Sequence, residues 1–374
     1  MKLRIFFILC LFIFLVQTTV SARTKLVTLP ERDEVKVHLD NPNSILVEEI
    51  RTITLQKGLN HIDFSWKGVS IEKSSFLIEV IDHKDKVRLI AFSYPPSENA
   101  VIAMVYSDVA MEEKIRFAYI LSGVNMVQSY MAVSDKKEEN LEFKSYVKIK
   151  NNSGEDFANA IISVGYGKEY VKSLKNMEAK KMLSEKTVTP VSKKFVWDSA
   201  VQPHNPKDEA KTPGIPVFYE IENKTEAGLG KNPLLNGKVR IFQEDSVGTT
   251  AFLGEDWGQF TAVGDKMKIN VGESRDIVVT RKLMQSKEKN IRKNFYGNKV
   301  LFDREEIIEY KLENFKDKPL KITVKDHHEG YWEIINKTHN YEKKDATNFE
   351  FEIVIPAKGK ETLKYTLIQK NMRP

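Results

Sequence analysis

Apolar and polar side chains alternate along most of this chain, which is the pattern of half-buried β-strands. Residues 45–56 (ILVEEIRTITLQ) alternate throughout and place Arg51 on the same face as Ile53. Gly58 interrupts the pattern, which returns at residues 61–64. A strand, a glycine break and a second strand are typical of a β-hairpin, so we expect these two strands to pair.

The same spacing predicts short strands through both halves of the chain. In the first half they lie at residues 76–81, 87–92, 101–106, 115–121, 141–149 and 158–164. The turn residues at 151–154 (NNSG) predict that the last two of these form a hairpin. In the second half they lie at residues 239–243, 250–253, 267–271, 276–282, 305–314, 320–324, 332–335, 349–355 and 361–368.

One segment departs from strand spacing. Val171, Leu174 and Met177 recur every three residues among lysines and glutamates, which predicts an amphipathic helix over residues 169–185. Residues 188–216 then contain five prolines, which remove backbone donors and oppose both helix and central strand. We interpret them as an exposed insertion or linker.

The predicted fold is mainly β, with two immunoglobulin-like β-sandwich blocks joined by a short helix and a proline-rich insertion. The first block spans residues 23–165, the helix and insertion residues 166–216, and the second block residues 217–374.

The amino terminus predicts export from the cytoplasm. Lys2 and Arg4 precede a run of about a dozen apolar residues, and Val20-Ser21-Ala22 resembles a signal-peptidase site. Residues 1–22 are therefore predicted to be a cleaved signal peptide, which also removes Cys10, the only cysteine. We expect the protein in the periplasm or at the cell surface, without disulfides and without a transmembrane segment after cleavage.

Charge gives little support for a nucleic-acid partner. The chain has 58 basic and 52 acidic residues, and without Lys2 and Arg4 the balance is 56 to 52, a net charge of +4. No basic stripe suited to a phosphate backbone is present. Local clusters indicate either solvated surface or contact with an anionic envelope polymer or lipid headgroup. They comprise Lys168, Lys172, Lys175, Lys180 and Lys181, and then Lys287, Lys289, Arg292 and Lys293.

Several segments, in order, resemble the mucoidy inhibitor A-like family of bacterial exported proteins of unknown function. They are residues 152–157 (NSGEDF), 232–242 (NPLLNGKVRIF), 252–256 (FLGED), 332–334 (WEI), 341–346 (YEKKDA) and 351–365 (FEIVIPAKGKETLKY). Phe157 stands where the family usually has tryptophan, and the amino-terminal coiled coil of longer members is missing. The resemblance implies a link to envelope or exopolysaccharide biology and supplies no catalytic residues.

The densest cluster of metal-ligand side chains is Asp326-His327-His328-Glu329. Imidazoles suit zinc or copper, and His339 is a more distant third ligand. Consecutive residues of an extended strand point to opposite faces, so both histidines reach one ion only if a turn redirects them. The cluster therefore predicts either a metal site at His327 and His328 or an exposed turn.

Three residues are candidates for ligand binding. Trp197 lies beside the proline-rich segment, so it is the tryptophan expected to be exposed and able to stack on a sugar. Glu255 and Asp256 lie at a turn signal and are candidate paired carboxylates. Their alternative is an ordinary pair of hairpin acids.

Three aromatic residues are expected to be structural. Trp332 shares a strand face with Ile334, and Phe351 and Tyr365 lie on strands expected to neighbour it. We expect all three in the core of the second block.

No complete catalytic or cofactor motif is present in the sequence. Residues 272–276 (GESRD) lack the closing glycine of a nucleophile elbow, and a strand follows where the elbow needs a helix. We therefore expect a non-enzymatic envelope protein without a cofactor, a binding or scaffold module whose partner is an envelope polysaccharide or another envelope protein. The alternative is a periplasmic carbohydrate-active hydrolase.

Overall fold

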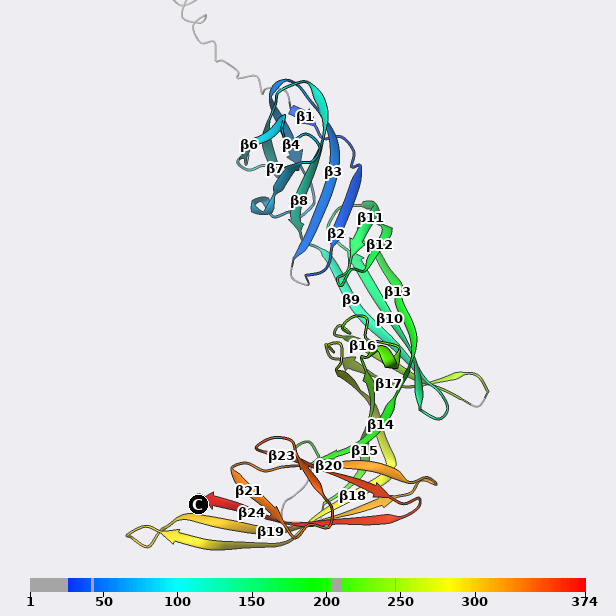
Figure 1. The fold of residues 1–374 in the computed structure, drawn as a ribbon, viewed down its shortest axis with the longest axis vertical. Helices are drawn as coiled ribbons and strands as arrows, with labels where there is room; N and C mark the ends of the chain where they lie inside the picture. Colours follow the sequence, from blue (N-terminus) through cyan, green and yellow to red (C-terminus); the bar gives the residue numbers. More distant parts are fainter. Residues whose placement is uncertain (1–25, 42–43, 203–209, 246) are drawn as a thin grey trace, which may run out of the picture. The chain divides into compact units, whose positions relative to one another are not determined.

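The computed structural model describes residues 26–41, 44–202, 210–245 and 247–374. The expected signal segment, residues 1–22, lies outside this part. The described chain is mainly β, as the alternation predicts, and its helices are the short 3-10 turns η1 (Lys73–Ser75) and η2 (Thr225–Ala227) (Figure 1). None of the helices described here is long and apolar enough to cross a membrane.

Two compact units divide the chain differently from the expected blocks. The first unit comprises Met1–Met126 and Ile149–Lys180, and the second comprises Val127–Lys148 and Lys181–Pro374. The boundary therefore does not follow one linker, because a segment from the middle of the chain returns to the first unit.

The first unit contains two sheets. One has the order β1-β4-β7-β6, from β1 (Leu26–Thr28), β4 (Gly58–Ser65), β7 (Ala100–Ser107) and β6 (Val87–Ser93). The other has the order β12-β11-β2-β3-β8-β5, from β12 (Glu169–Leu174), β11 (Phe157–Ser163), β2 (Glu34–His38), β3 (Ile45–Leu55), β8 (Met111–Leu121) and β5 (Leu77–Val80). Phe64 of one sheet packs on Phe117 and Tyr119 of the other, with ring centroids 5.4 and 5.5 Å apart.

The hairpin expected between residues 45–56 and 61–64 is wrong. Both strands form, as β3 and β4, but β3 pairs with β2 and β8 while β4 pairs with β1 and β7. Gly58 at φ 98° turns the chain. The buried Asn60 side chain accepts the Gln56 N–H at 2.9 Å and donates to the Gln56 carbonyl at 2.8 Å. The glycine break therefore marks a corner at which the chain moves from one sheet to the other.

The second unit also contains two sheets. The smaller has the order β13-β10-β9-β16-β17, from β13 (Ala179–Pro190), β10 (Asn140–Asn151), β9 (Val124–Ser134), β16 (Gly237–Glu244) and β17 (Thr250–Gly258). Its core includes Phe143, Ile241 and Ile269. The hairpin expected between residues 141–149 and 158–164 is wrong, because β10 belongs to this sheet whereas β11 pairs with β12 and β2.

The larger sheet of the second unit has nine strands. Its order is β21-β24-β19-β18-β15-β14-β20-β23-β22, from β21 (Tyr331–Ile335), β24 (Lys360–Met372), β19 (Lys299–Asn314), β18 (Lys266–Lys293), β15 (Ala210–Glu222), β14 (Ser192–Asp198), β20 (Leu320–His327), β23 (Asn348–Ile355) and β22 (Tyr341–Lys343). β23 also contacts β24 and β19, which stand at the other side of the sheet order. The sheet thus folds over one core, in which Phe351 stacks on Tyr365 at 5.2 Å.

The helix predicted over residues 169–185 is wrong. That segment forms β12 and the start of β13, joined by a turn with Met177 at φ 65°. Val171 and Met177 are 65% and 73% exposed, and only Leu174 of the apolar series is buried. Both strands lie at sheet edges, where backbone pairing determines the conformation although the apolar spacing happens to match a helix.

The proline-rich segment is largely sheet and not a linker. Pro190 ends β13, and Pro216 lies within β15. Pro213 also lies in β15, beside a register shift at which Gly214 adopts φ 93°. An irregularity of this kind is where a strand tolerates proline. Residues 203–209 lie outside the described chain.

The expected packing residues Trp332, Phe351 and Tyr365 all lie buried in the core of the nine-stranded sheet. Trp332 packs on Phe349 at 4.8 Å and donates its indole N–H to the Ala346 carbonyl at 2.8 Å. Trp332→Ala is therefore expected to lower the free energy of unfolding by about 3–5 kcal/mol, measured by urea denaturation. Trp257→Ala is the control, because Trp257 is 50% exposed. Equal losses in the two variants would contradict this assignment.

Candidate binding site

Two charged residues stand on the core-facing side of β3. Because side chains alternate along a strand, Glu49 and Arg51 share a face with the buried residues Val47, Ile53 and Leu55. The Glu49 side chain is fully buried. A charged carboxylate that is buried away from water is tolerated only if cations and hydrogen-bond donors surround it.

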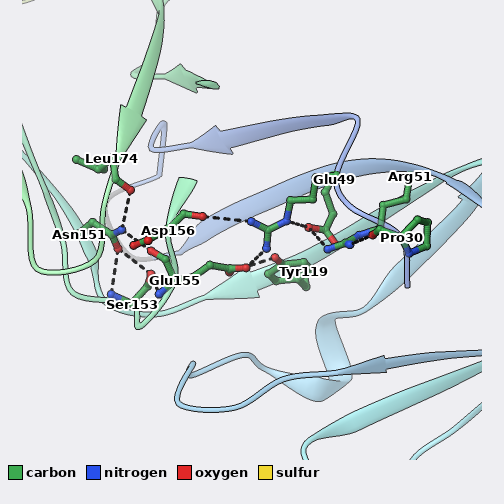
Figure 2. Close-up of polar contacts among 10 residues, drawn as sticks. Pro30, Glu49, Arg51, Tyr119, Asn151, Ser153, Glu155, Asp156 and Leu174 are labelled. Atoms are coloured by element: carbon green, nitrogen blue, oxygen red, sulfur yellow. Dashed lines mark hydrogen bonds and ion pairs between the residues drawn. The ribbon is translucent and has the colours of Figure 1, made fainter. Parts of the chain in front are cut away.

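Two guanidinium groups supply these donors, as Figure 2 shows. Arg51 donates from Nε to Glu49 Oε1 at 3.0 Å and from Nη2 to Oε2 at 3.2 Å. Arg32, in the segment before β2, donates from Nε to Oε2. Arg51 also donates to the Pro30 carbonyl, which fixes the chain before β2 beside β3. Both oxygens of the buried carboxylate are therefore occupied.

Arg32 continues the network to the loop between β10 and β11. Its Nη2 pairs with Glu155, and its Nη1 donates to the Asp156 carbonyl at 3.4 Å. Its guanidinium also lies 6.0 Å from the centre of the buried Phe157 ring. One arginine thus joins an inward carboxylate of the sheet to a surface loop.

The loop itself is held by the buried Asn151 (Figure 2). Its Nδ2 donates to the Glu155 carbonyl at 2.7 Å and the Leu174 carbonyl at 3.3 Å. Its Oδ1 accepts from the Ser153 N–H at 3.1 Å and from the Ser153 hydroxyl at 2.7 Å. The Asp156 carboxylate accepts the Asn176 N–H at 2.6 Å. These bonds fix the positions of Glu155 and Asp156.

Gly154 permits a close approach between this loop and the loop after β4. It adopts φ 89°, and a Cβ at this position would overlap the carbonyl oxygen of Gly68. A larger residue would force the two loops apart. The glycine therefore sets the distance between Glu155 and the segment that contains Trp66 and Lys67.

An aromatic cluster forms the apolar wall of the site. Trp66 is half-buried and stacks on Phe76 at 5.6 Å, and Tyr119 also stacks on Phe76, at 5.2 Å. Burial raises the pKa of Tyr119 well above its ordinary value, so its hydroxyl stays protonated. That hydroxyl lies 3.5 Å from Glu155 Oε2.

These elements enclose an open cavity of about 700 Å³ within the first unit. It is lined by Leu29, Arg32, Arg51, Phe64, Ser65, Trp66, Lys67, Val69, Ile71, Tyr119, Gly154, Glu155, Asp156 and Asn176. An aromatic wall faced by a few fixed polar groups is the usual composition of a small-ligand site.

The sequence candidates for ligand binding do not lie in this cavity. Trp197 is buried in the nine-stranded sheet and donates to Thr212 Oγ1 at 3.3 Å, so the expectation that it is exposed is wrong. Glu255 pairs with Lys238 and Arg240, whereas Asp256 accepts the Asn270 N–H at 2.6 Å. Neighbours in an extended strand face opposite ways, so these two acids do not converge.

The two candidate metal ligands are also separated. His327 is exposed and its Nδ1 lies 3.1 Å from Asn348 Oδ1, whereas His328 is largely buried and stacks on Phe349 at 5.9 Å. Within the described chain, no group of three or more His, Cys, Asp or Glu residues is placed to hold a metal ion.

Asp326 instead belongs to a buried network in the nine-stranded sheet. Tyr310 donates to its Oδ2 at 2.5 Å, Tyr365 donates to the same oxygen, and Arg281 donates to Tyr310 Oη at 3.0 Å. Burial would raise the pKa of Asp326, but the nearby positive charge of His328 and Arg281 and the two hydroxyls lower it below its ordinary value.

Arg32, Glu49, Trp66 and Tyr119 were not identified as site residues from the sequence. A detectable signal was present in β3, where Glu49 and Arg51 occupy inward positions between Val47 and Ile53. Charges at core positions of a strand indicate a partner elsewhere in the fold. The identity of that partner is not encoded in the local pattern.

Compared with known proteins, this chain matches no family model and no curated sequence.

Removing the buried carboxylate leaves two guanidinium groups without their shared acceptor. Glu49→Ala is therefore expected to lower the free energy of unfolding by about 3–5 kcal/mol. The matched control is Glu255→Ala, whose side chain is exposed and whose loss should cost about 0–1 kcal/mol. Chemical denaturation of both variants measures the difference, and a Glu49 variant as stable as the control would contradict the network.

The Asp326 network predicts how stability depends on pH. Burial lowers the pKa of His328 below its ordinary value of 6.5, so the unfolded chain binds this proton more readily than the folded protein. Stability is expected to fall as the pH drops below about 6.5, and further below about 3.8, where Asp326 of the unfolded chain takes up a proton that the folded protein, with its lowered pKa, does not yet bind. Denaturation between pH 7 and 5 should show a smaller slope for His328→Phe and an unchanged slope for the exposed control His327→Phe.

Proposed function

We propose that this protein is a non-enzymatic, exported binding module of the cell envelope, and that the first unit binds a hydroxyl-rich saccharide of an envelope polysaccharide. The observation that carries the proposal is the cavity, which is lined both by the half-buried Trp66 and by arginines held in fixed positions. An aromatic ring packs on the apolar face of a sugar, and fixed polar groups recognise its hydroxyls.

The arginines retain donors for a ligand. A guanidinium group has five N–H donors. Arg51 uses three, toward both Glu49 oxygens and the Pro30 carbonyl, and Arg32 uses three, toward Glu49, Glu155 and the Asp156 carbonyl. Arg32 also meets the Tyr119 hydroxyl, so we expect the two remaining N–H groups of Arg51 to be the donors for ligand hydroxyls.

The charge balance favours a neutral sugar over a polyanion. Arg32, Arg51 and Lys67 contribute three positive charges at the cavity wall, and Glu155 and Asp156 contribute two negative ones. Glu49 lies directly behind and neutralises the third. A site with no net charge offers no long-range attraction for a charged polymer.

The polar contacts also favour binding over hydrolysis. A glycoside hydrolase needs two carboxyl groups across the scissile bond, one of them protonated. Here guanidinium groups occupy both Glu49 oxygens, Glu155 pairs with Arg32, and Asp156 accepts a backbone N–H. None is placed as a free acid, which supports a binding role.

The remaining parts of the proposal rest on the sequence. The amino-terminal segment supports export, and the resemblance to the mucoidy inhibitor A-like family supports an envelope location. The proposed architecture of two immunoglobulin-like sandwiches is supported by the paired sheets of the first unit and by the contacts of β23 with β19 and β24 across the core of the second.

Binding should depend on the aromatic ring of Trp66. On a printed array of neutral bacterial oligosaccharides, Trp66→Ala is expected to bind its best ligand about tenfold more weakly, a loss of about 1.4 kcal/mol. Trp66→Phe should retain most of the affinity because the stacking surface remains. Titration calorimetry with that ligand measures the difference.

Trp257→Ala is the matched control, because it removes another exposed tryptophan outside the cavity. Equal weakening in this control would refute the assignment of the site. Release of reducing ends from a bound oligosaccharide, abolished in Glu155→Gln, would support the hydrolase alternative.

A further inference from the structure

The longest hairpin of the second unit ends in two exposed aromatic rings. β18 and β19 pair as far as Lys293 and Lys299. The pairing of β24 with β19 ends before that point, at Phe302. The end of the hairpin is therefore two-stranded and extends past its neighbours (Figure 1). At its turn Phe295 is 97% exposed and Tyr296 is 83% exposed.

The turn holds these rings outward by its own hydrogen bonds. The Asn294 side chain accepts the N–H groups of Tyr296 and Asn298, both at 3.0 Å, and the Asn294 N–H donates to the Asn298 carbonyl at 2.9 Å. Gly297 adopts φ 80°, as expected in a three-residue hairpin loop. Phe295 and Tyr296 thus occupy the outermost positions, with ring centroids 5.6 Å apart.

The base of this end is fixed to the carboxyl-terminal strand. Asp303 accepts from Asn290 Nδ2 at 2.8 Å and from the Asn371 N–H at 2.9 Å, and Arg292 donates to the Asn371 side chain. The rings are therefore presented by an ordered support.

The hairpin end that carries the rings contains several basic side chains. Residues 289–300 contain four basic side chains, Lys289, Arg292, Lys293 and Lys299, and no acidic one. Three carboxylates pair with three of these four cations, which leaves a local net charge of +1. Lys293 has no carboxylate partner among the described residues, and the other three pair with acids that lie farther from the tip.

We propose that this hairpin tip docks on an anionic phospholipid bilayer, with Phe295 and Tyr296 entering the headgroup region and the basic residues contacting lipid phosphates. Aromatic rings with one polar end favour the membrane interface, and basic residues add attraction to anionic lipid. The hollow nearest to the rings lies at the base of the hairpin end, between Arg292, Asp303 and Asn371, and neither Phe295 nor Tyr296 lines it. The positive charge of the tip also repels the same tip on a second copy of this protein.

Vesicle sedimentation tests the proposal. The full chain is mixed with vesicles of phosphatidylcholine, either pure or containing 30% phosphatidylglycerol. Every variant carries the same residues 1–22, so any binding through these residues is the same in all of them. Wild type is expected to bind the anionic vesicles at least tenfold more tightly. The loss of Phe295 and Tyr296, in Phe295→Ser/Tyr296→Ser, should weaken binding by about tenfold or more. Lys289→Gln/Lys293→Gln should weaken it about 25-fold and reduce its salt dependence.

The matched control is Phe252→Ser/Trp257→Ser, which removes two rings that are 57% and 50% exposed on another part of the second unit. It should bind as wild type does. Equal loss in control and tip variants, or no preference of wild type for anionic vesicles, would overturn the proposal. Binding to heparin without binding to vesicles would also overturn it, and would identify a polymer as the occupant. Saccharide binding through Trp66 is measured separately, so failure of either proposal leaves the other intact.

Discussion

The buried carboxylate of Glu49 constrains three separate segments of the first unit. It lies on the inner face of a sheet, so its charge has to be balanced by residues from outside β3 as well as by Arg51. Arg32 reaches it from the segment before β2 and also pairs with Glu155. The sheet and two connecting segments therefore become one polar unit, and the walls of the cavity have their shape because this charge is satisfied.

Buried asparagines have a comparable role where strands end. Asn60, Asn151, Asn223 and Asn314 are all buried, and each donates to backbone carbonyls of a turn or loop. An amide can donate and accept at once, so a single side chain satisfies both kinds of orphaned backbone group. In a fold with many strand ends, backbone groups without a partner in the sheet are frequent, and these asparagines satisfy some of them.

Strand positions were predictable from the sequence, and strand partners were not. The alternation of residues 45–56 depends on burial of one face and is visible locally, so β3 was located correctly. Which sheet receives the next strand depends on the corner at Gly58, where a hairpin and a change of sheet have the same sequence signal. In residues 169–185 even the type of element was mispredicted. Edge strands bury few side chains, so the spacing of their apolar residues does not distinguish a strand from a helix. Trp197 shows that proline-rich neighbours do not imply exposure, since β14 is a central strand of its sheet. The cavity could not be predicted from the sequence, because its walls come from segments that are far apart along the chain.

The parallel pairing of β14 with β20 joins residues 195–198 to residues 322–325, more than a hundred positions later. Contacts so distant in sequence require a large loop to close before any stabilisation is gained, and they make folding slow. A growing chain that has not reached Leu320 leaves one side of β14 unpaired and lacks the aromatic half of its core. The second unit can therefore complete its fold only when almost the entire polypeptide is present. Any cellular step that needs an unfolded chain can therefore act on this protein until its last strands have been synthesised. A truncated product would expose an unpaired strand edge and would be prone to aggregation.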